Sequence, residues 1–339
     1  MTVNTLQTDI LAIPPIPSDL LDKFLNDEVI VFIGNGVSRL GGIASWKDLA
    51  LSFWNECFQT GKVNYATYSR LKNELIDPLE LLSICSEKLG SQNIKDCLKA
   101  KISFISEKDK QKLYEIYGYI RDFQAGYVTT NYDGFLEDAP LTFDSLRREE
   151  DELRKKFEEP VQPLQRVNLN DNLEKHKNKI VYLHGSARSS NKVDNKIILT
   201  LNDYLEHYKD QKDKQNGKSF LKNLFNKTCL FIGYGLKEQE ILQHIVPPGN
   251  LVTHYLLQGM FKDNACILKE YQRYYKSIHI ELIPYSLSER GYVQLAAVLQ
   301  EWSKEIRQQR INKYKKLIQT QEDEKNIALI MEQKHGTFK

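Results

Sequence analysis

The stretch VIVFIGNGVSRLGG, Val29–Gly42, joins an apolar run to a turn of small and polar residues. The uninterrupted apolar run is typical of a parallel strand that helices cover on both faces. Gly34 and Gly36 permit backbone angles and close approaches that other residues resist. The stretch therefore fits two interpretations: a tight turn between a strand and a helix, or a loop whose backbone amides bind a diphosphate. By itself it favours neither.

Five more short apolar runs follow and are predicted as strands, at residues 127–130, 180–183, 229–232, 253–257 and 278–283. Capping residues and helical spacing predict helices that begin near Ser18 and Trp46, and others over about 77–89 and 108–123. This alternation predicts an α/β, Rossmann-like fold with a mainly parallel sheet and helices on both faces. In such sheets ligands bind at the carboxyl ends of the strands, so the motifs that follow the strands are expected to converge on one cleft.

The chain divides into three parts by composition. Residues 1–28 are expected to form an N-terminal arm, in which three prolines exclude a helix, followed by a short helix. Residues 29–300 are expected to form the core, with a helical insertion at about 45–125. Charged insertions at about 145–179 and 203–227 are expected to be solvated and largely helical. Residues 301–339 are read as a polar C-terminal helix and tail, the end of a helix predicted over 293–333.

The charge balance excludes two classes of partner. The 339 residues include 47 Lys and Arg against 45 Asp and Glu, which gives a net charge of +2 and no case for a nucleic-acid or membrane surface. No apolar run approaches the ~20 residues of a membrane span, and the N-terminus lacks a secretion-signal pattern. We therefore expect a cytoplasmic protein.

The cysteines argue against a metal. There are five of them, an odd number, and no two form a CxxC pair. This pattern is typical of buried thiols in a reducing compartment, and it predicts neither a disulfide framework nor a structural zinc site. No metal is expected.

A dehydrogenase is disfavoured by the residues around the glycine loop. Nucleotide-binding dehydrogenases show GxGxxG and an acidic residue about 20 positions later, at the end of the next strand. Here Arg39 occupies the third glycine position, and the residues around Glu56 are predicted as helix. Glu56 is therefore a poor ribose ligand.

Two further motifs follow predicted strands. TTNYD places Thr129, Thr130, Asn131 and Asp133 together, where they form either a hydrogen-bonding site or a structural turn. YLHGS places His184 directly after a strand, where a neutral imidazole is suited to proton transfer or water orientation near neutral pH. A packed histidine is the alternative.

Taken in order, these motifs resemble those of the sirtuin-like NAD-consuming family, over roughly residues 29–300. The glycine loop resembles GNGVSRLGGIASW, the Thr-x-Asn-x-Asp motif matches TTNYD, the His-Gly pair matches His184 and Gly185, and the later glycine motif resembles GYGLKEQEI at 233–241. Protein-deacylating sirtuins carry a four-cysteine zinc module after the histidine, whereas no cysteine occurs here between Gly185 and Thr228. GYG, with Tyr234, resembles the bacterial antiphage-defence branch, in which the domain cleaves NAD to nicotinamide and ADP-ribose.

The resemblance implies that NAD is the substrate and assigns roles to the motif residues. Asn131 would orient a ribose hydroxyl and the attacking water, His184 would act as base, and Asp133 would fix the nicotinamide pocket or its own turn. The diphosphate is assigned to Gly34, Gly36 and Ser38, and the adenosine side to Gly233, Tyr234 and Gly235. Asn35, Val37, Arg39 and Thr129 complete the expected NAD-binding set, with Arg39 either reaching a phosphate or lying on the surface.

Two other functions remain open: an NAD-dependent protein deacylase, and a module that senses NAD or ADP-ribose without turnover. An NAD hydrolase needs control, and no part of the chain outside the core is large enough for a sensor domain. We therefore expect a separately encoded regulatory partner or a homo-oligomer. The N-terminal arm and the helix from Gly291 to about Lys316 are the expected contact surfaces. The alternative for its stripe of Leu295, Leu299, Trp302 and Ile306 is packing on the sheet.

Overall fold

The structure is a computed structural model that describes residues 10–74, 76–103, 105–159, 161–169, 177–188, 196–209, 216–245 and 252–336. Its helices are α1 (Ser18–Leu25), α2 (Asn35–Arg39), α3 (Trp46–Gln59), α4 (Tyr65–Asn73), α5 (Pro78–Leu89), α6 (Ser91–Ser103), α7 (Glu107–Arg121), α8 (Phe135–Asp138), α9 (Asp144–Lys155), α10 (Leu201–His207), α11 (Gly217–Leu224), α12 (Gln239–Leu242), α13 (Ala265–Lys276) and α14 (Gln294–Gly336). Short 3₁₀ turns precede α13 and α14, at Lys262–Asn264 and Gly291–Val293.

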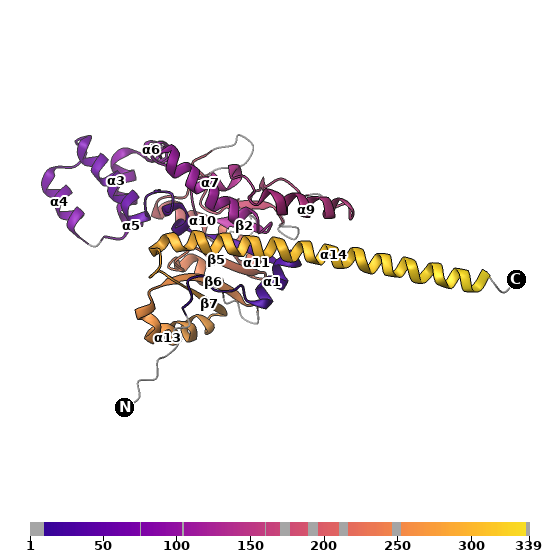
Figure 1. The fold of residues 1–339 in the computed structure, drawn as a ribbon. Helices are drawn as coiled ribbons and strands as arrows, with labels where there is room; N and C mark the ends of the chain where they lie inside the picture. The colour runs from indigo at the N-terminus through magenta and orange to yellow at the C-terminus, as the bar shows by residue number, and fades with distance from the viewer. Residues whose placement is uncertain are drawn as a thin grey trace, which may run out of the picture.

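A parallel sheet forms the centre of the molecule (Figure 1). Its strands are β1 (Val29–Ile33), β2 (Gly126–Thr129), β3 (Gln165–Arg166), β4 (Lys179–Tyr182), β5 (Thr228–Ile232), β6 (His254–Met260) and β7 (Ile280–Ser286). They lie in the order β3-β4-β2-β1-β5-β6-β7, and every pair is parallel. The predicted Rossmann-like α/β fold is confirmed. The short strand β3 was not predicted.

Strand register brings the predicted motifs to one edge. Ile33, the last residue of β1, pairs with Thr129 of β2 and with Ile232 of β5. Thr129 in turn pairs with Tyr182, the last residue of β4. The four loops that follow these strands therefore start at the same level, at the carboxyl edge of the sheet.

Helices cover both faces of the sheet, as predicted. One face carries α1, α7 and α14, which pack on Val29, Val31 and Ile33 of β1. The other face carries α10 to α13, which pack with Ile30 and Phe32 of the same strand. Alternate residues of β1 thus face two different apolar cores, which explains its continuous apolar sequence.

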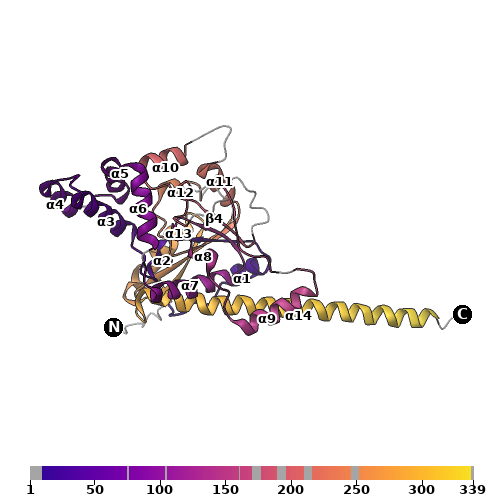
Figure 2. The same ribbon diagram turned by 90° about the horizontal axis from the view of Figure 1, so that it is seen from above.

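Helices α3 to α6 form a module with a core of its own. Phe53 and Trp54 of α3 pack against α5 and α6, and the module meets the body through Tyr132, Ile197 and Leu199. The predicted cap of α3 is confirmed, since the Ser45 hydroxyl accepts the Asp48 N–H, and the Asp77 carboxylate, which was not predicted as a cap, caps α5. Seen from above, the module lies on the side of the body opposite the free end of α14 (Figure 2).

The N-terminal arm and the base of α14 pack on the body. The Leu11 carbonyl accepts the Ser286 N–H at 2.7 Å, and the Trp302 indole N–H donates to the Pro14 carbonyl at 2.8 Å. The stripe of Leu295, Leu299, Trp302 and Ile306 is buried on the sheet. The packing alternative is therefore confirmed for this stripe, and it is not a free contact surface. Residues 1–9 lie outside the described part of the chain.

The prediction that both charged insertions are solvated is wrong. In the first, Glu150 and Arg154 of α9 are buried. In the second, α10 and α11 contribute Tyr204, Leu221 and Leu224 to the core on one face of the sheet. These charged segments have buried faces because ion pairs neutralise some charges and solvent-facing positions hold the others.

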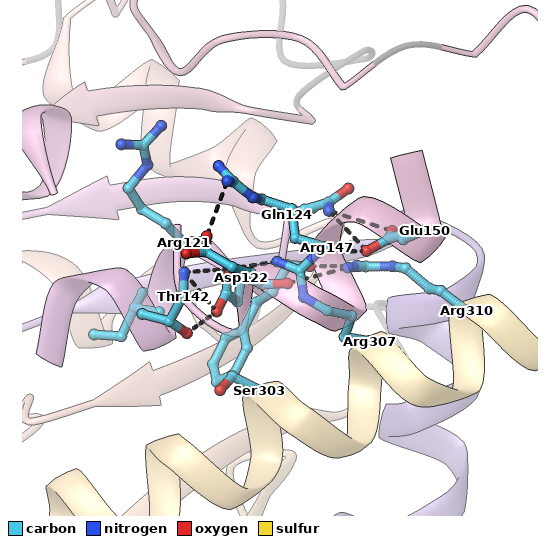
Figure 3. A network of polar contacts seen from close by, with 12 residues as sticks. Arg121, Asp122, Gln124, Thr142, Arg147, Glu150, Ser303, Arg307 and Arg310 are labelled. Carbon is cyan, nitrogen blue, oxygen red and sulfur yellow. Dashed lines mark hydrogen bonds and ion pairs between the residues drawn. The ribbon is translucent and has the colours of Figure 1, made fainter. Parts of the chain in front are cut away.

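A buried ionic network joins α14 to α7 and α9 (Figure 3). The Arg307 guanidinium donates to Asp122, just after α7, and to Glu150 of α9, the latter at 2.7 Å. All three side chains are fully buried. The two carboxylates also accept hydrogen bonds from Thr142 and Arg154, so their charges are compensated inside the protein.

In the described part of the chain, no helix combines the length and apolar character that crossing a bilayer requires.

Candidate functional site

The glycine loop after β1 packs directly on the loop after β5. The Gly34 N–H donates to the Ile232 carbonyl at 2.9 Å, and the Gly36 N–H donates to the Gly233 carbonyl at 2.8 Å. A Cβ atom at Gly34 would lie 2.5 Å from the Gly233 oxygen, and one at Gly36 would lie 2.7 Å from the Gly233 Cα. The glycines are therefore required by the contact between the two loops. Their amides already have protein partners, so this arrangement favours the tight-turn interpretation over diphosphate binding.

The other residues of this loop differ in exposure. Val37 is buried, and Arg39 is exposed at the end of α2. The Asn35 amide donates to the Ala44 carbonyl at 3.2 Å, while its Oδ1 is buried without a hydrogen-bond partner among the described residues. In the β5 loop, Tyr234 is buried and Gly235 is exposed. The roles assigned to these residues in NAD binding stay predictions.

The TTNYD motif is tied to the glycine loop by a buried polar cluster. Asp133 accepts hydrogen bonds from the Ser38 hydroxyl at 2.5 Å and from the Tyr117 hydroxyl at 3.0 Å. The Asn131 amide donates to the Gly34 carbonyl at 3.1 Å and to Tyr117 at 3.3 Å. All these side chains are almost fully buried. The structure therefore brings together Ser38, Asn131 and Asp133, as expected, and adds Tyr117 from α7.

Asp133 and Asn131 differ in whether their buried side-chain oxygens have hydrogen-bond partners. Burial raises the pKa of Asp133, and hydrogen bonds from Ser38, the Phe135 N–H and Tyr117 oppose that rise. These partners leave Asp133 as the anchor of its turn, one of its two expected roles. The Asn131 Oδ1, by contrast, is buried without a hydrogen-bond partner among the described residues. Thr129 fixes the start of this loop: its hydroxyl donates to the Ile33 carbonyl and accepts the Asn131 N–H.

His184 lies in an aromatic enclosure made largely by α10. Its Nε2 is 2.8 Å from the Tyr208 hydroxyl, and its Nδ1 is 3.2 Å from the Tyr204 hydroxyl. Burial lowers the pKa of His184 to about 3, and the nearby His207 contributes to the shift. The imidazole is therefore neutral at physiological pH.

One carboxylate approaches His184. The Glu238 Oε2, from the loop after β5, lies 3.8 Å from the His184 Nε2. This oxygen is buried without a hydrogen-bond partner among the described residues, although 29% of the side chain is exposed. Burial raises the pKa of Glu238 to about 7, and the Tyr234 hydroxyl opposes the rise.

The site is closed in this arrangement. The space lined by Ile33, Tyr117, Thr129, Asn131, Asp133, Leu136 and Tyr182 leaves no room for a water molecule. Backbone bonds hold the strand ends close together here: the Leu183 N–H donates to the Thr129 carbonyl at 2.8 Å. A dinucleotide can enter only if side chains or loops around this space move.

Sequence reasoning missed four residues of the site: Tyr117, Tyr204, Tyr208 and Glu238. Tyr117 lies in the helix that was predicted over about 108–123 and received no role, and Tyr204 and Tyr208, in and just after α10, lie in a segment that was expected to be solvated. Glu238 lies within the quoted GYGLKEQEI motif but received no role. A signal was present in the i, i+4 spacing of Tyr204 and Tyr208, which places both on one side of a helix.

No group of three or more His, Cys, Asp or Glu side chains in the described ranges is arranged to hold a metal ion. All five cysteines are free thiols. The absence of a metal stays a prediction.

Comparison with known proteins identifies the region that contains these motifs. No curated protein matches the chain significantly. Residues 125–247 match the family model described as SIR2-like domain. The match begins just before β2 and ends just after α12, so it includes Asn131, His184 and Glu238. Residues 125–247 are thus similar to a SIR2-like domain, and this match supports an NAD-related function.

Proposed function

We propose that this chain is an NAD glycohydrolase that cleaves NAD to nicotinamide and ADP-ribose. The main support is the buried, unpartnered Oδ1 of Asn131 at the carboxyl end of β2, beside the glycine loop. A buried amide oxygen without a partner costs stability, so its position is explained if a ligand donates a hydrogen bond to it. A ribose hydroxyl or the attacking water is such a donor.

In the proposed reaction the protein forms no covalent bond to the substrate. The C1′–N bond to nicotinamide breaks, and its electron pair goes to the ring nitrogen, which neutralises the leaving group. A water oxygen bonds to C1′, and His184 accepts the proton that the water loses. Asn131 holds the ribose hydroxyl or the water in place, while Asp133, anchored by Ser38 and Tyr117, keeps the TTNYD loop rigid.

The sequence between the histidine and β5 favours hydrolysis over deacylation. The zinc module of deacylating sirtuins needs four cysteines in this region, and none occurs between Gly185 and Thr228. That module helps form the cleft for an acylated lysine. Water is therefore the acceptor we propose for the ribose.

The closed site is consistent with control by a second protein or by self-association. A free NAD hydrolase would deplete the NAD of its own cell, and here the space at Asn131 is filled by neighbouring side chains. We propose that the activating signal opens this space, and that the protein is the NAD-depleting effector of an antiphage defence system. Beyond Asn312, α14 extends past the body in Figures 1 and 2, and its largely exposed residues 313–326 are the remaining surface of that helix for such a contact.

The test is nicotinamide release from NAD by the purified chain, with and without an acetylated lysine peptide, over a range of protein concentrations. We expect release without the peptide once self-association at high protein concentration or added phage lysate opens the site, and loss of this release in Asn131→Ala. Asn223→Ala, an exposed asparagine on α11, is the matched control. Release only with the peptide would establish a deacylase. Binding of NAD without release under any condition, phage lysate included, would establish a sensor.

A further inference from the structure

We propose that Glu238 is a positioning residue for the proposed NAD cleavage, and that its carboxylate stabilises the imidazolium that forms when His184 takes the proton from water. The inference rests on the proposed function for its reaction. Its geometric basis is independent of that function: Glu238 Oε2 lies 3.8 Å from His184 Nε2, and it is buried without a hydrogen-bond partner among the described residues.

His184 needs such a partner because its other neighbours cannot balance a positive charge. Tyr204 and Tyr208 are neutral hydroxyls at its two ring nitrogens, and burial raises the pKa of both far above neutrality. The His207 ring centroid lies 6.3 Å from that of His184, and His207 lowers the pKa of His184 and supplies no negative charge. A protonated His184 among these groups alone would be a buried, uncompensated charge.

The two tyrosines suit either protonation state of the imidazole. With His184 neutral, one tyrosine donates to the bare nitrogen and the other accepts from the N–H. With His184 protonated, both hydroxyls turn to accept, because a hydroxyl can do either. The tyrosines therefore orient the ring in both protonation states. The negative charge of the Glu238 carboxylate balances the positive charge that the imidazole gains on protonation.

The loop after β5 is shaped so that Glu238 returns to the site. Leu236 adopts a positive φ of 49°, which is uncommon for a residue with a side chain, and its own side chain is buried. Glu238 then precedes α12, and its carbonyl accepts the N–H groups of Ile241 and Leu242. A backbone fixed on both sides keeps the carboxylate near His184.

The charged and titratable groups around the pair set the expected pH dependence. The groups that interact with Glu238 or His184 are Tyr132 after β2, Tyr204, His207 and Tyr208 at α10, and Tyr234 and Glu240 beside β5 and α12. Burial and the neighbouring Glu240 raise the pKa of Glu238 to about 7, against the opposing effect of Tyr234, so Glu238 is partly protonated near neutral pH. Near neutrality the carboxyl of Glu238 is therefore expected to hold this proton while His184 is neutral, and the carboxylate that forms as the pH rises can stabilise a protonated His184. The rate of cleavage should rise as that proton leaves.

The first experiment measures nicotinamide release between pH 5.5 and 8.5 in the wild type, Glu238→Gln and Glu238→Asp. We expect Glu238→Gln to lower kcat about 10- to 100-fold with KM within about threefold, because an opposite charge at this distance shifts a pKa by about 1–2 units. The rise in rate through pH 7 should disappear in Glu238→Gln and be partly restored in Glu238→Asp. Glu270→Gln, an exposed glutamate on α13, is the matched control. A wild-type pH profile in Glu238→Gln would overturn the proposal.

The second experiment does not depend on activity. Histidine-selective NMR on the full chain follows the imidazole of His184, assigned by its loss in His184→Gln. We expect the chemical shifts of the neutral imidazole to change near pH 7 in the wild type, because they report the titration of the neighbouring Glu238, and this change should be absent from Glu238→Gln. If the wild type shows this titration but releases no nicotinamide, the pairing stands and the proposed function fails. If the His184 shifts still change near pH 7 in Glu238→Gln, the pairing itself is wrong, whatever the activity.

Discussion

Two buried polar regions of this molecule are built from similar residues and differ in how fully they are satisfied. Beneath α14, Arg307 bridges Asp122 and Glu150, and nearly every polar atom of these three side chains has a protein partner, with Arg307 Nε the exception (Figure 3). At the carboxyl edge of the sheet, Asn131 Oδ1 and Glu238 Oε2 are buried without partners in the described structure. In the first region the opposite charges compensate one another. In the second, two buried oxygen acceptors have no hydrogen-bond donor among the described residues.

The difference indicates what each region is for. A buried polar group with all its partners inside the protein contributes to one specific packing of helices. A buried group without a partner lowers stability and is retained where a ligand or a reacting proton completes it. Loss of a residue should therefore affect the fold in one region and the chemistry in the other.

The largest expected effect is on activity at the carboxyl edge. Asn131→Ala should reduce nicotinamide release about 10²- to 10⁴-fold, since it removes the group that positions the ribose or the water. Its free energy of unfolding should fall by only about 1 kcal/mol, for the lost bonds to Gly34 and Tyr117. Urea denaturation and the nicotinamide assay check both numbers. A large loss of stability with normal activity would reverse the assignment of this region.

The next effect is on stability beneath α14. Arg307→Leu leaves Asp122 and Glu150 as buried carboxylates without their main counter-ion, which should cost about 3–5 kcal/mol of unfolding free energy. Activity per folded molecule should be unchanged. Lys304→Leu, an exposed position on the same helix, is the control.

If Arg307→Leu does not fold, Glu150→Gln keeps the shape of the side chain and removes one charge, and a smaller loss of stability is expected. Wild-type stability in both variants would show that the network contributes nothing to the fold.

Acid should lower the free energy of unfolding, because three buried histidines are neutral in the folded protein. Burial lowers the pKa of His184 to about 3, and those of His207 and His254 to about 4, from an ordinary value of 6.5. The unfolded chain then binds more protons than the folded one below pH 6.5, so stability is present above that pH and is lost as the pH falls toward 4. Each histidine contributes at most about 1.4 kcal/mol per pH unit in this window.

Urea unfolding between pH 7 and 5 measures this slope. His254 is the first residue of β6 and lies away from His184. The substitution His254→Asn should make the slope shallower, because the His254 Nδ1 accepts the Cys229 N–H only in the neutral form. A slope that does not change in this variant would show that His254 is not held neutral by the fold.

The smallest expected effect concerns the link between the two regions. Helix α7 carries Tyr117 into the site and ends beside Asp122 in the ionic network. Tyr117→Phe removes the hydroxyl that contacts Ser38, Asn131 and Asp133, and should cost about 1 kcal/mol of stability with a severalfold loss of activity. Tyr119→Phe on the same helix loses a half-exposed bond to Glu115 and should cost less than half as much. Equal effects in the two variants would remove Tyr117 from the site.

The sequence predicted what depends on local pattern. Continuous apolar runs identified β1, β2, β4 and β5, and polar motifs directly after them marked the edge where the loops meet. The buried face of α9 could not be predicted, because the partner of Glu150 lies 157 residues later in the chain. Tyr117 and Glu238 were missed for the same reason, since their roles depend on contacts between loops that the sheet order brings together. The sequence singled out the glycines of GNG as positions of close approach. The structure shows that the group approaching them is the backbone of the loop after β5.

The most direct test of the account is the affinity for NAD at Asn131. His184→Ala should bind NAD without cleaving it, so calorimetry can compare this variant with the double variant His184→Ala/Asn131→Ala. If the unpartnered Oδ1 of Asn131 receives a hydrogen bond from NAD, the double variant should bind about tenfold more weakly, with its unfolding midpoint nearly unchanged. Equal affinities, or no binding by either protein, under the conditions in which the wild type releases nicotinamide would contradict the claim that this buried oxygen is kept for the substrate.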